Sequence, residues 1–348
     1  MIFQENHPLL LSGNKKLDPL TQGVLGAALP QSISNKKSLG IIGIIGFLSG
    51  LAPDLDIFIR SESDPILFLE FHRQFTHSLI FIPFGGLICS LVLYCLISKR
   101  FGITFKETWI YSTLGYATHG LLDACTSYGT LLFWPFSQTR IAWNNISIID
   151  PLFTIPLLIL IITAAIKQKK IFSIVAVLWA IFYLLLGVYQ KNEAIKVSIK
   201  IAQERGHDVI RVNVKPSIGN LLLWKSIYET EEKFYVDAIR LGWSTKIFNG
   251  ESINKLNTQS AFPWLMEDSQ QSRDIKRFKW FSNGYIALNP KNNNQILDIR
   301  YSTLPNEIGG LWGIELSREK ANNGHVKYIT NRTISKEKKK IFKEMLFN

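Results

Sequence analysis

Cysteine is scarce in this sequence, and its placement fits neither a disulfide framework nor a thiolate metal site. Cys89, Cys95 and Cys125 each lie within or beside an apolar run, and no two of them form a CxxC pair. A free cysteine usually packs as a small hydrophobic side chain. The sequence therefore argues against a disulfide-bonded scaffold and against metal ligation by cysteine.

Charge is scarce in the first half of the chain. Residues 1–190 carry 13 Lys/Arg and 10 Asp/Glu, whereas residues 191–348 carry 26 and 17. The first part therefore has the composition of a membrane-embedded region and the second that of a soluble domain. We expect an N-terminal tail at residues 1–16, a membrane-embedded helical domain at 17–190 and a soluble α+β domain at 191–348. The tail lacks the apolar core and cleavage site of a signal peptide.

The excess of positive charge does not indicate a nucleic-acid surface. Most basic residues of the second half are scattered singly among acidic ones. One cluster lies on an expected C-terminal helix, and it consists of Lys336, Lys338, Lys339 and Lys340. No aromatic residue is interleaved with this cluster, which suits anionic lipid better than nucleic acid. We expect no nucleic-acid partner.

Apolar segments separated by short polar connections fill the first half. They are residues 17–31, 39–52, 76–98, 107–125, 151–166 and 171–189. A helix needs about 20 apolar residues to cross a bilayer, so the first two fall short of a span. The pattern predicts a multi-pass α-helical membrane domain of about five or six segments, some of them short.

Basic residues mark alternate connections between these segments, at residues 36–37, 99–106 and 167–170. By the positive-inside tendency, these connections face the cytoplasm. The loops at 60–75 and 126–150, together with the C-terminal half, then face outward.

The second half predicts a small α+β domain on the outer side. Strand candidates rich in β-branched and aromatic residues are 209–214, 221–228, 234–241, 296–301 and 311–316. Helices are expected at 192–205, 262–281 and 335–347. His207 and His325 lie in turn-like contexts with no partner at metal spacing, so we interpret them as surface residues.

Carboxylates and imidazoles gather at the ends of the apolar segments. Asp54 and Asp56 follow Pro53 at the end of one segment, and His72 and His77 stand at the start of the next. An unpaired carboxylate in or beside a hydrophobic segment is costly, so it is by default a functional hypothesis.

A second cluster lies in the segment 107–125, where His119 and Asp123 are four residues apart. On a helix both side chains project from one face. Each element alone has a simpler explanation, since HxxxD occurs by chance, an aspartate can cap a helix, and structural ion pairs imitate sites. Their convergence on one expected face favours a metal site. The expected ligands are Asp54, Asp56, His72, His77, His119 and Asp123.

The mixed nitrogen and oxygen ligand set suits a divalent metal, zinc first and manganese as the alternative. A metal at such a site favours hydrolysis by an activated water. A spare carboxylate, Asp56 or Asp54, or else His72 is the candidate general base. Arg73 and Arg140 are candidate clamps for a substrate phosphate. A lipid headgroup contact or a structural ion pair explains these arginines equally well. The candidate catalytic residues are Asp56, His72 and Arg73.

Several motifs, in their order along the chain, resemble those of the YdjM-like membrane-bound metal-dependent hydrolases. They are LDPLTQGVLGAA, GLAPDLD, HRQFTHS, GYATHGLLD, TSYGT and WPF, and the resemblance covers about residues 17–158. It is weaker over the C-terminal half, where VKPSIGNLLLW is similar to a segment of longer members.

This resemblance implies a bacterial inner-membrane protein with hydrolase activity and a divalent metal. The six expected ligands occupy matching positions. Shorter members carry Thr-His where this chain has Thr21 and Gln22, so no first-helix ligand is expected here. The HxxxD element also resembles that of zinc-dependent phospholipase C, which favours a phosphoester or lipid substrate.

The leading hypothesis is a metal-dependent hydrolase in the inner membrane that acts on a lipid-linked or phosphorylated substrate. The alternative is a non-catalytic membrane protein whose soluble domain binds an envelope partner, with the His/Asp cluster as a structural or metal-handling site. Ion transport is disfavoured because residues 151–189 carry almost no polar side chains outside one basic connection.

Overall fold

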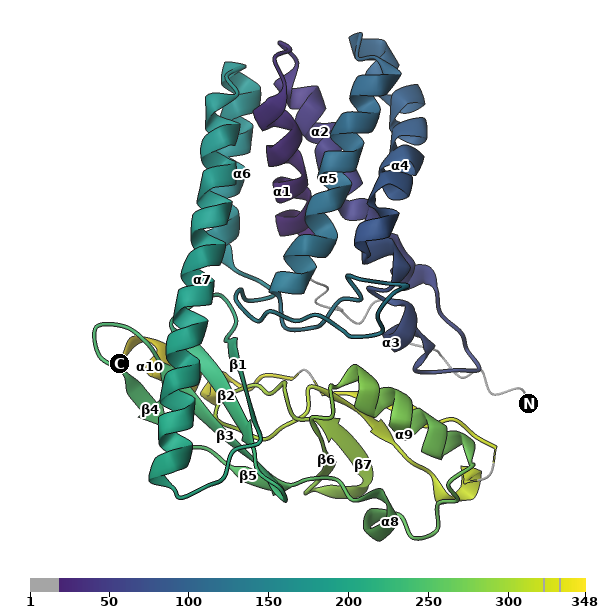
Figure 1. The fold of residues 1–348 in the computed structure, drawn as a ribbon, viewed down its shortest axis with the longest axis vertical. Coiled ribbons are helices and arrows are strands. Elements are labelled where there is room, and N and C mark those ends of the chain that lie inside the picture. The colour runs from purple at the N-terminus through teal and green to yellow at the C-terminus, as the bar shows by residue number, and fades with distance from the viewer. Residues whose placement is uncertain (1–18, 322, 332) are drawn as a thin grey trace, which may run out of the picture.

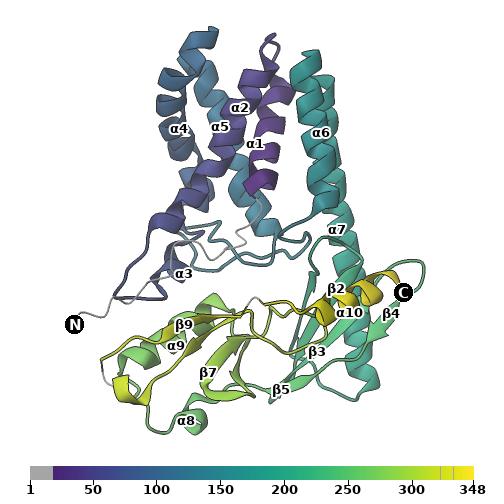
Figure 2. The same ribbon diagram turned by 180° about the vertical axis from the view of Figure 1, so that it is seen from behind.

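The computed structural model describes residues 19–321, 323–331 and 333–348. The tail expected at residues 1–16 lies outside these ranges. The described chain forms a tier of helices and, next to one end of it, a C-terminal domain of sheets and helices (Figure 1). One long helix, α7, belongs to both parts. Figure 2 shows the same arrangement from behind.

The helical tier consists of six helices that run alternately toward and away from the C-terminal domain (Figure 1). They are α1 (Pro19–Ile33), α2 (Leu39–Leu51), α4 (Ile82–Leu96), α5 (Phe105–Cys125), α6 (Pro151–Lys167) and α7 (Ile171–Glu204). Each connection at the far end is short. The two longer connections, between α2 and α4 and between α5 and α6, lie at the end next to the C-terminal domain.

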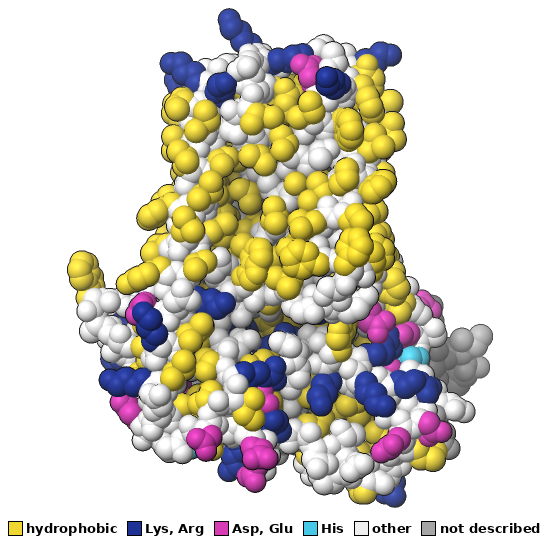
Figure 3. Space-filling model, in the orientation of Figure 1, with side chains coloured by type: hydrophobic (Ala, Val, Ile, Leu, Met, Phe, Trp, Pro, Cys, Tyr) yellow, Lys and Arg dark blue, Asp and Glu magenta, His cyan; other side chains and the backbone are white. Residues whose placement is uncertain are grey.

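Three helical segments are long and apolar enough to cross a membrane, namely Leu39–Phe58, Leu79–Leu96 and Ile171–Glu204, and α6 is a shorter apolar helix. On the face drawn in Figure 3, many hydrophobic side chains cover the side of the helical tier, and Lys and Arg side chains gather at its far end. The segment 39–52 is longer than expected, because the short helix η1 (Ala52–Phe58) continues it past Pro53. Proline is well tolerated at the first position of a new helix.

The connection between α2 and α4 is built from short helical turns. After η1 come α3 (Leu67–Phe71), η2 (Phe75–His77) and η3 (Leu79–Phe81). The helix expected from residue 76 begins only at Ile82, where Pro83 suits its first turn. Thr76 caps no helix, because its hydroxyl donates to Asp56 Oδ2 at 2.8 Å.

Small residues let α1, α2 and α5 approach closely at the centre of the tier. A Cβ on Gly26 or Gly46 would collide with the carbonyl oxygen of the other, and a Cβ on Gly115 would collide with the Gly46 carbonyl. Such contacts let helix backbones pack tightly in a membrane. They bring α2 against the middle of α5, just before the turns of α5 that carry His119 and Asp123.

The C-terminal domain contains two antiparallel sheets. The first has the order β1-β2-β3-β4 with β5 also paired to β3, and the second has the order β6-β7-β8-β9. Its strands are β1 (Arg211–Pro216), β2 (Leu223–Glu229), β3 (Lys233–Arg240), β4 (Lys246–Phe248), β5 (Ser252–Asn254), β6 (Ile286–Asn289), β7 (Asn292–Asp298), β8 (Trp312–Glu315) and β9 (Lys327–Thr330). Its helices are α8 (Thr258–Ala261), α9 (Gln270–Phe281) and α10 (Lys336–Phe347). Two further short turns of the chain are η4 (Ser98–Phe101) and η5 (Arg318–Lys320).

The sequence predicted the α+β character of this domain correctly, and its five strand candidates overlap β1, β2, β3, β7 and β8. The helix expected over residues 262–281 was too long. Only α9 is helical there, because Ser269 accepts a hydrogen bond from the Ser272 amide and begins the helix as its N-cap. The short strands β4, β5, β6 and β9 carry too few alternating residues to be recognised.

The helix α7 connects the two parts through a shared apolar core. Its buried Ala194, Ile201 and Ala202 belong to the same cluster as Trp224 and Tyr228 of β2. Ser198 and Ser226 are also hydrogen bonded across this contact, with 2.6 Å between their hydroxyl oxygens. The expected boundary after residue 190 falls within α7, which is one uninterrupted helix of 34 residues.

Candidate metal centre

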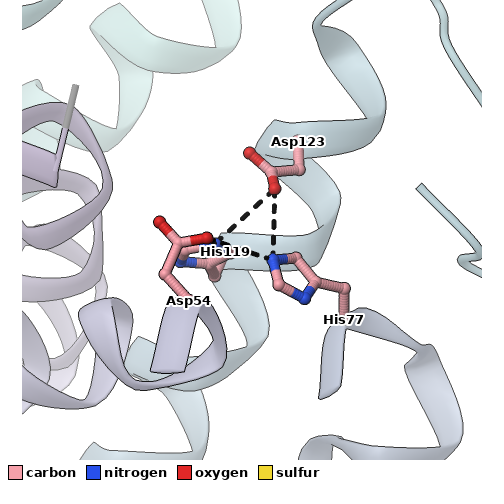
Figure 4. A group of neighbouring side chains, drawn as sticks. All are labelled: Asp54, His77, His119 and Asp123. Carbon is pink, nitrogen blue, oxygen red and sulfur yellow. Dashed lines mark ion pairs between the residues drawn. The ribbon is translucent and has the colours of Figure 1, made fainter. Parts of the chain in front are cut away.

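Four candidate ligands from three elements converge on one point (Figure 4). Asp54 comes from η1, His77 from η2, and His119 and Asp123 from neighbouring turns of α5. Each residue offers one ligand atom, and these four atoms all lie within 4.8 Å of one another.

The closest approaches pair each imidazole with both carboxylates. His77 Nε2 lies 3.3 Å from Asp123 Oδ2 and 3.5 Å from Asp54 Oδ1. His119 Nε2 lies 3.4 Å from Asp54 Oδ1 and 3.6 Å from Asp123 Oδ2. The two imidazole rings are nearly perpendicular, with centroids 4.7 Å apart. Two nitrogen and two oxygen atoms that face one another form a ligand set that could bind a shared cation.

A glycine beside His119 makes the convergence possible. A Cβ on Gly120 would collide with the carbonyl oxygen of His77, so only glycine lets η2 lie directly against α5. On the other side of the site, Gly50 of α2 accepts a hydrogen bond from His119 Nδ1 at 2.6 Å. The motifs around the ligands therefore serve the packing as well as the chemistry.

The four converging atoms are buried, and none of them makes a hydrogen bond within the described part of the chain, although Asp123 Oδ2 forms an ion pair with Arg73 Nε at 2.9 Å. They are His77 Nε2, His119 Nε2, Asp54 Oδ1 and Asp123 Oδ2. Because Nδ1 of His119 faces a carbonyl acceptor, that nitrogen carries the proton in the neutral ring and Nε2 presents its lone pair. Buried lone pairs and carboxylate oxygens that face one another are costly unless a cation or a proton lies between them. The ligand types and their burial fit a divalent metal ion.

Asp56 lies behind His77. Its Oδ2 accepts from the Arg73 amide at 2.9 Å and from the Thr76 hydroxyl at 2.8 Å, and it lies 3.2 Å from His77 Nδ1. Its Oδ1 lies 2.7 Å from His72 Nδ1. A carboxylate that holds the second nitrogen of a ligating histidine is a common support in metal sites. Asp54, Asp56 and His72 also form a second group of mutually close ligand atoms, which shares Asp54 with the first.

Arg73 is fully buried beside Asp123. Its Nε lies 2.9 Å from Asp123 Oδ2, its Nη1 donates to the Thr126 hydroxyl at 3.2 Å, and its guanidinium lies 4.7 Å from the Tyr128 ring centroid. Its backbone φ is 64°, a conformation that residues other than glycine rarely adopt. Hydrogen bonds at its amide, to Asp56, and at its carbonyl, from the Leu131 amide, hold it there.

Gln22 also reaches the site, although no ligand was expected from the first helix. Its Nε2 donates to Asp123 Oδ1 at 2.7 Å from the buried face of α1. Gln22 therefore orients the oxygen of Asp123 that does not face the other ligands. A buried glutamine within an apolar helix is the signal that could have found it, because such a side chain needs a polar partner.

The remaining candidates lie away from the four ligand atoms. Arg140 contacts three carbonyl groups, with its shortest hydrogen bond, 2.7 Å, from Nη2 to the oxygen of Gly129. His207 Nδ1 lies 2.8 Å from the Tyr228 hydroxyl, and His325 Nδ1 lies 2.9 Å from Asp274 Oδ2.

Comparison with known proteins places this site within a recognised family. The family model described as YdjM inner membrane protein matches residues 17–194, which is just over half of the chain and contains every candidate ligand. A Bacillus subtilis (strain 168) relative, described as uncharacterized protein YfhP, is 25% identical over 213 residues. That alignment covers 60% of this chain and 62% of the relative, less than two thirds of its length. No solved structure matches the chain. The chain belongs to the YdjM inner membrane protein family.

Proposed function

We propose that this protein is a membrane-bound, metal-dependent hydrolase that acts on a phosphoester or lipid-linked substrate. The observation that carries the proposal is the convergence of four buried ligand atoms that lack hydrogen-bond partners among the described residues. Asp54, His77, His119 and Asp123 are the proposed ligands, and zinc is the proposed metal, with manganese as the alternative.

A divalent ion bound there lowers the pKa of a water molecule and polarises a carbonyl or phosphoryl oxygen. The chain's own groups then have separate tasks. Arg73 and Gln22 hold Asp123 from two sides. Asp56 holds the rings of His77 and His72. These contacts support a positioning role for Arg73 and Asp56 in the proposed reaction, rather than direct contact with substrate.

His72 is the proposed group that exchanges a proton with substrate or solvent. Its side chain is 15% exposed, whereas those of His77 and His119 are fully buried. Its Nδ1 is fixed by Asp56, so the ring has one orientation. A histidine with one ring nitrogen held by a carboxylate is a common arrangement for a general base or acid.

An apolar rim next to the ligands supports a lipid-linked substrate. Leu55 lies between Asp54 and Asp56 in the sequence, Phe58 follows Asp56 by two residues, and the two are 63% and 77% exposed. Among the four ligands, Asp54 has the most exposed side chain, at 21%. A catalytic metal site keeps an open position, and the Asp54 side is where a substrate would enter.

A structural role for the cluster is the second candidate function. His77, His119 and Asp123 are almost completely buried, and structural metal sites are usually closed. Protonated imidazoles paired with the two carboxylates would also satisfy these atoms without a metal. The two functions differ in what they require, because only a hydrolase needs the accessible Asp54 edge and His72.

The test is the metal content of the full-length protein, purified in a mild detergent and measured by elemental analysis. We expect near-stoichiometric zinc or manganese in the wild type and its loss in a His119→Ala, Asp123→Ala double variant. His207→Ala is the matched control and should keep the metal, because His207 contacts Tyr228 instead. No metal in the wild type, even after reloading, would contradict the proposal. A bound metal with no turnover across phosphoester and lipid substrates would favour the structural role.

A further inference from the structure

A cavity of about 60 Å³ lies between the loop that follows α5 and the C-terminal domain. The loop contributes Gly129, Arg140 and Asn144, β1 contributes Asn213 and Lys215, and the segment after β7 contributes Arg300. One water needs roughly 10–15 Å³ by this kind of measure. The cavity therefore has room for a group of several non-hydrogen atoms, such as a tetrahedral oxyanion, and not for a whole lipid.

Three basic side chains line this cavity, and two of them have no carboxylate partner in the part of the chain that the structure describes. Arg300 is neutralised by Asp298, with Nη2 lying 2.7 Å from Oδ2. Among the described residues, no ion pair involves Arg140 or Lys215. Lys215 Nζ instead lies 3.2 Å from the centroid of the Tyr301 ring. Among the described residues, no carboxylate therefore balances Arg140, or Lys215 in its protonated form.

Keeping these two charges without an anion is costly. Burial lowers the pKa of Lys215 well below its ordinary value, the charges of Lys225 and Arg300 lower it further, and the charge of Asp298 offsets part of this. Lys215 therefore needs an anion beside it to stay protonated. Burial also lowers the pKa of Arg140 to about 10. Arg140 Nε is buried without a hydrogen-bond partner within the described ranges. An anion in the cavity would offset both the charge and the missing hydrogen bond.

The cavity is adjacent to the metal centre. Tyr128, between the lining residues Ser127 and Gly129, has the guanidinium of Arg73 4.7 Å and that of Arg140 5.7 Å from its ring centroid. Arg73 in turn contacts Asp123. Arg140 Nη2 also donates to the carbonyl oxygen of His72 at 3.3 Å. A group bound in the cavity therefore lies one aromatic side chain away from residues of the proposed catalytic site.

We propose that this cavity binds a phosphate-class oxyanion through Lys215 and Arg140, and that the C-terminal domain thereby selects substrates that carry such a group. The second part rests on the proposed hydrolase function. The first part does not, because none of the four proposed metal ligands lines the cavity. The anion is either free phosphate or a phosphate ester at the head of a lipid.

The test is calorimetric titration of inorganic phosphate into the full-length protein in a phosphate-free, uncharged detergent. We expect one saturable site. Lys215→Met should weaken phosphate binding about 10-fold or more, since a hydrogen bond to a charged group is lost. Lys215→Arg should retain most of the affinity. Lys291→Met is the matched control, because Lys291 is exposed on the same domain and should leave binding unchanged.

Two further comparisons separate this inference from the proposed hydrolase function. Phosphate binding should persist after chelator treatment and in the His119→Ala, Asp123→Ala variant. Phosphate binding that is lost with the metal and is insensitive to Lys215→Met would place the anion at the candidate metal centre, and this would overturn the inference. The absence of any phosphate binding would overturn it as well. Nanodiscs with phosphatidic acid distinguish the source. Weaker phosphate binding there than in zwitterionic nanodiscs identifies a lipid phosphate as the ligand, and equal binding identifies the free anion.

Discussion

At the scale of single residues, Asp123 is held by four side chains in the candidate metal centre. One of its oxygens faces His77, His119 and Arg73, and the other accepts from Gln22. Arg73 places a positive charge beside Oδ2 of Asp123, the same oxygen that is proposed to bind the metal. Asp123 therefore has to be oriented accurately to contact both Arg73 and the metal. Gln22 supplies that orientation from α1 without adding charge.

Replacing Gln22 by leucine should therefore weaken metal binding without removing a ligand. Loss of a group that orients a metal ligand typically costs about 10–100-fold in metal affinity. The measurement is zinc affinity by chelator competition on the purified variant. Gln31→Leu is the control, because Gln31 is equally buried on α1 but its hydrogen bonds go to Leu39 and Ser173. Equal zinc affinities of the two variants would show that Gln22 does not act on the site.

At the scale of helices and turns, the site depends on how closely η2 approaches α5. Gly120 leaves no room for a side chain beneath the His77 carbonyl, and Gly46 and Gly115 bring α2 against the same helix. The ligands therefore come from three elements whose spacing is set by glycines. Small changes in that spacing alter the distances among all four ligand atoms at once.

Gly120→Ala should move η2 away from α5 and abolish stoichiometric metal binding, even though no ligand changes. The control is Gly40→Ala on α2, where a Cβ would meet only the Ala165 methyl at an ordinary 3.8 Å. There alanine should be neutral or stabilise the helix by about 0.5–1 kcal/mol. Metal content and thermal unfolding in detergent are measured on both variants. A Gly120→Ala protein with full metal content would contradict the role given to this contact.

This dependence on packing explains which parts of the site the sequence could predict. The pair of His119 and Asp123 follows from helical spacing alone, and the acidic and histidine residues at the segment ends follow from the cost of polar groups beside apolar runs. The place of Asp56 behind His77 does not follow, because it depends on hydrogen bonds from the Arg73 amide and the Thr76 hydroxyl in a turn. The contact of Gln22 with Asp123 depends in the same way on the packing of α1 against α5.

The fold was predictable to a similar degree. Apolar length identified the helices of the tier, and β-branched residues identified the longer strands. The sequence could not predict that α7 shares an apolar core with the C-terminal domain. The residues that pack against Ala194 and Ile201 lie on strands that follow later in the sequence. The basic cavity was equally hidden, since Arg140 and Lys215 are far apart in sequence and meet only through the docking of the two parts.

At the scale of the whole molecule, charge and topology agree. The connections that carry the basic residues, at 36–37, 99–106 and 167–170, all lie at the end of the helical tier opposite the C-terminal domain (Figure 1). Figure 3 shows Lys and Arg side chains gathered at that end, with the hydrophobic side of the helices between them and the C-terminal domain. By the positive-inside tendency, we propose that the candidate metal centre and the C-terminal domain face the outer side of the inner membrane.

This orientation predicts opposite labelling of two single cysteines in a variant whose three native cysteines are replaced by serine or alanine. Lys37→Cys lies in the first basic connection, and Lys291→Cys lies on the exposed turn between β6 and β7. In spheroplasts, a membrane-impermeant maleimide should label Lys291→Cys at once and Lys37→Cys only after the membrane is opened. Detergent-solubilised protein is the control, in which both positions must react. Labelling of Lys37→Cys alone in sealed spheroplasts would show that the orientation is opposite to the one expected. A hydrolase at the metal centre would then act on cytoplasmic substrates, because the site lies at the same end of the tier as the C-terminal domain.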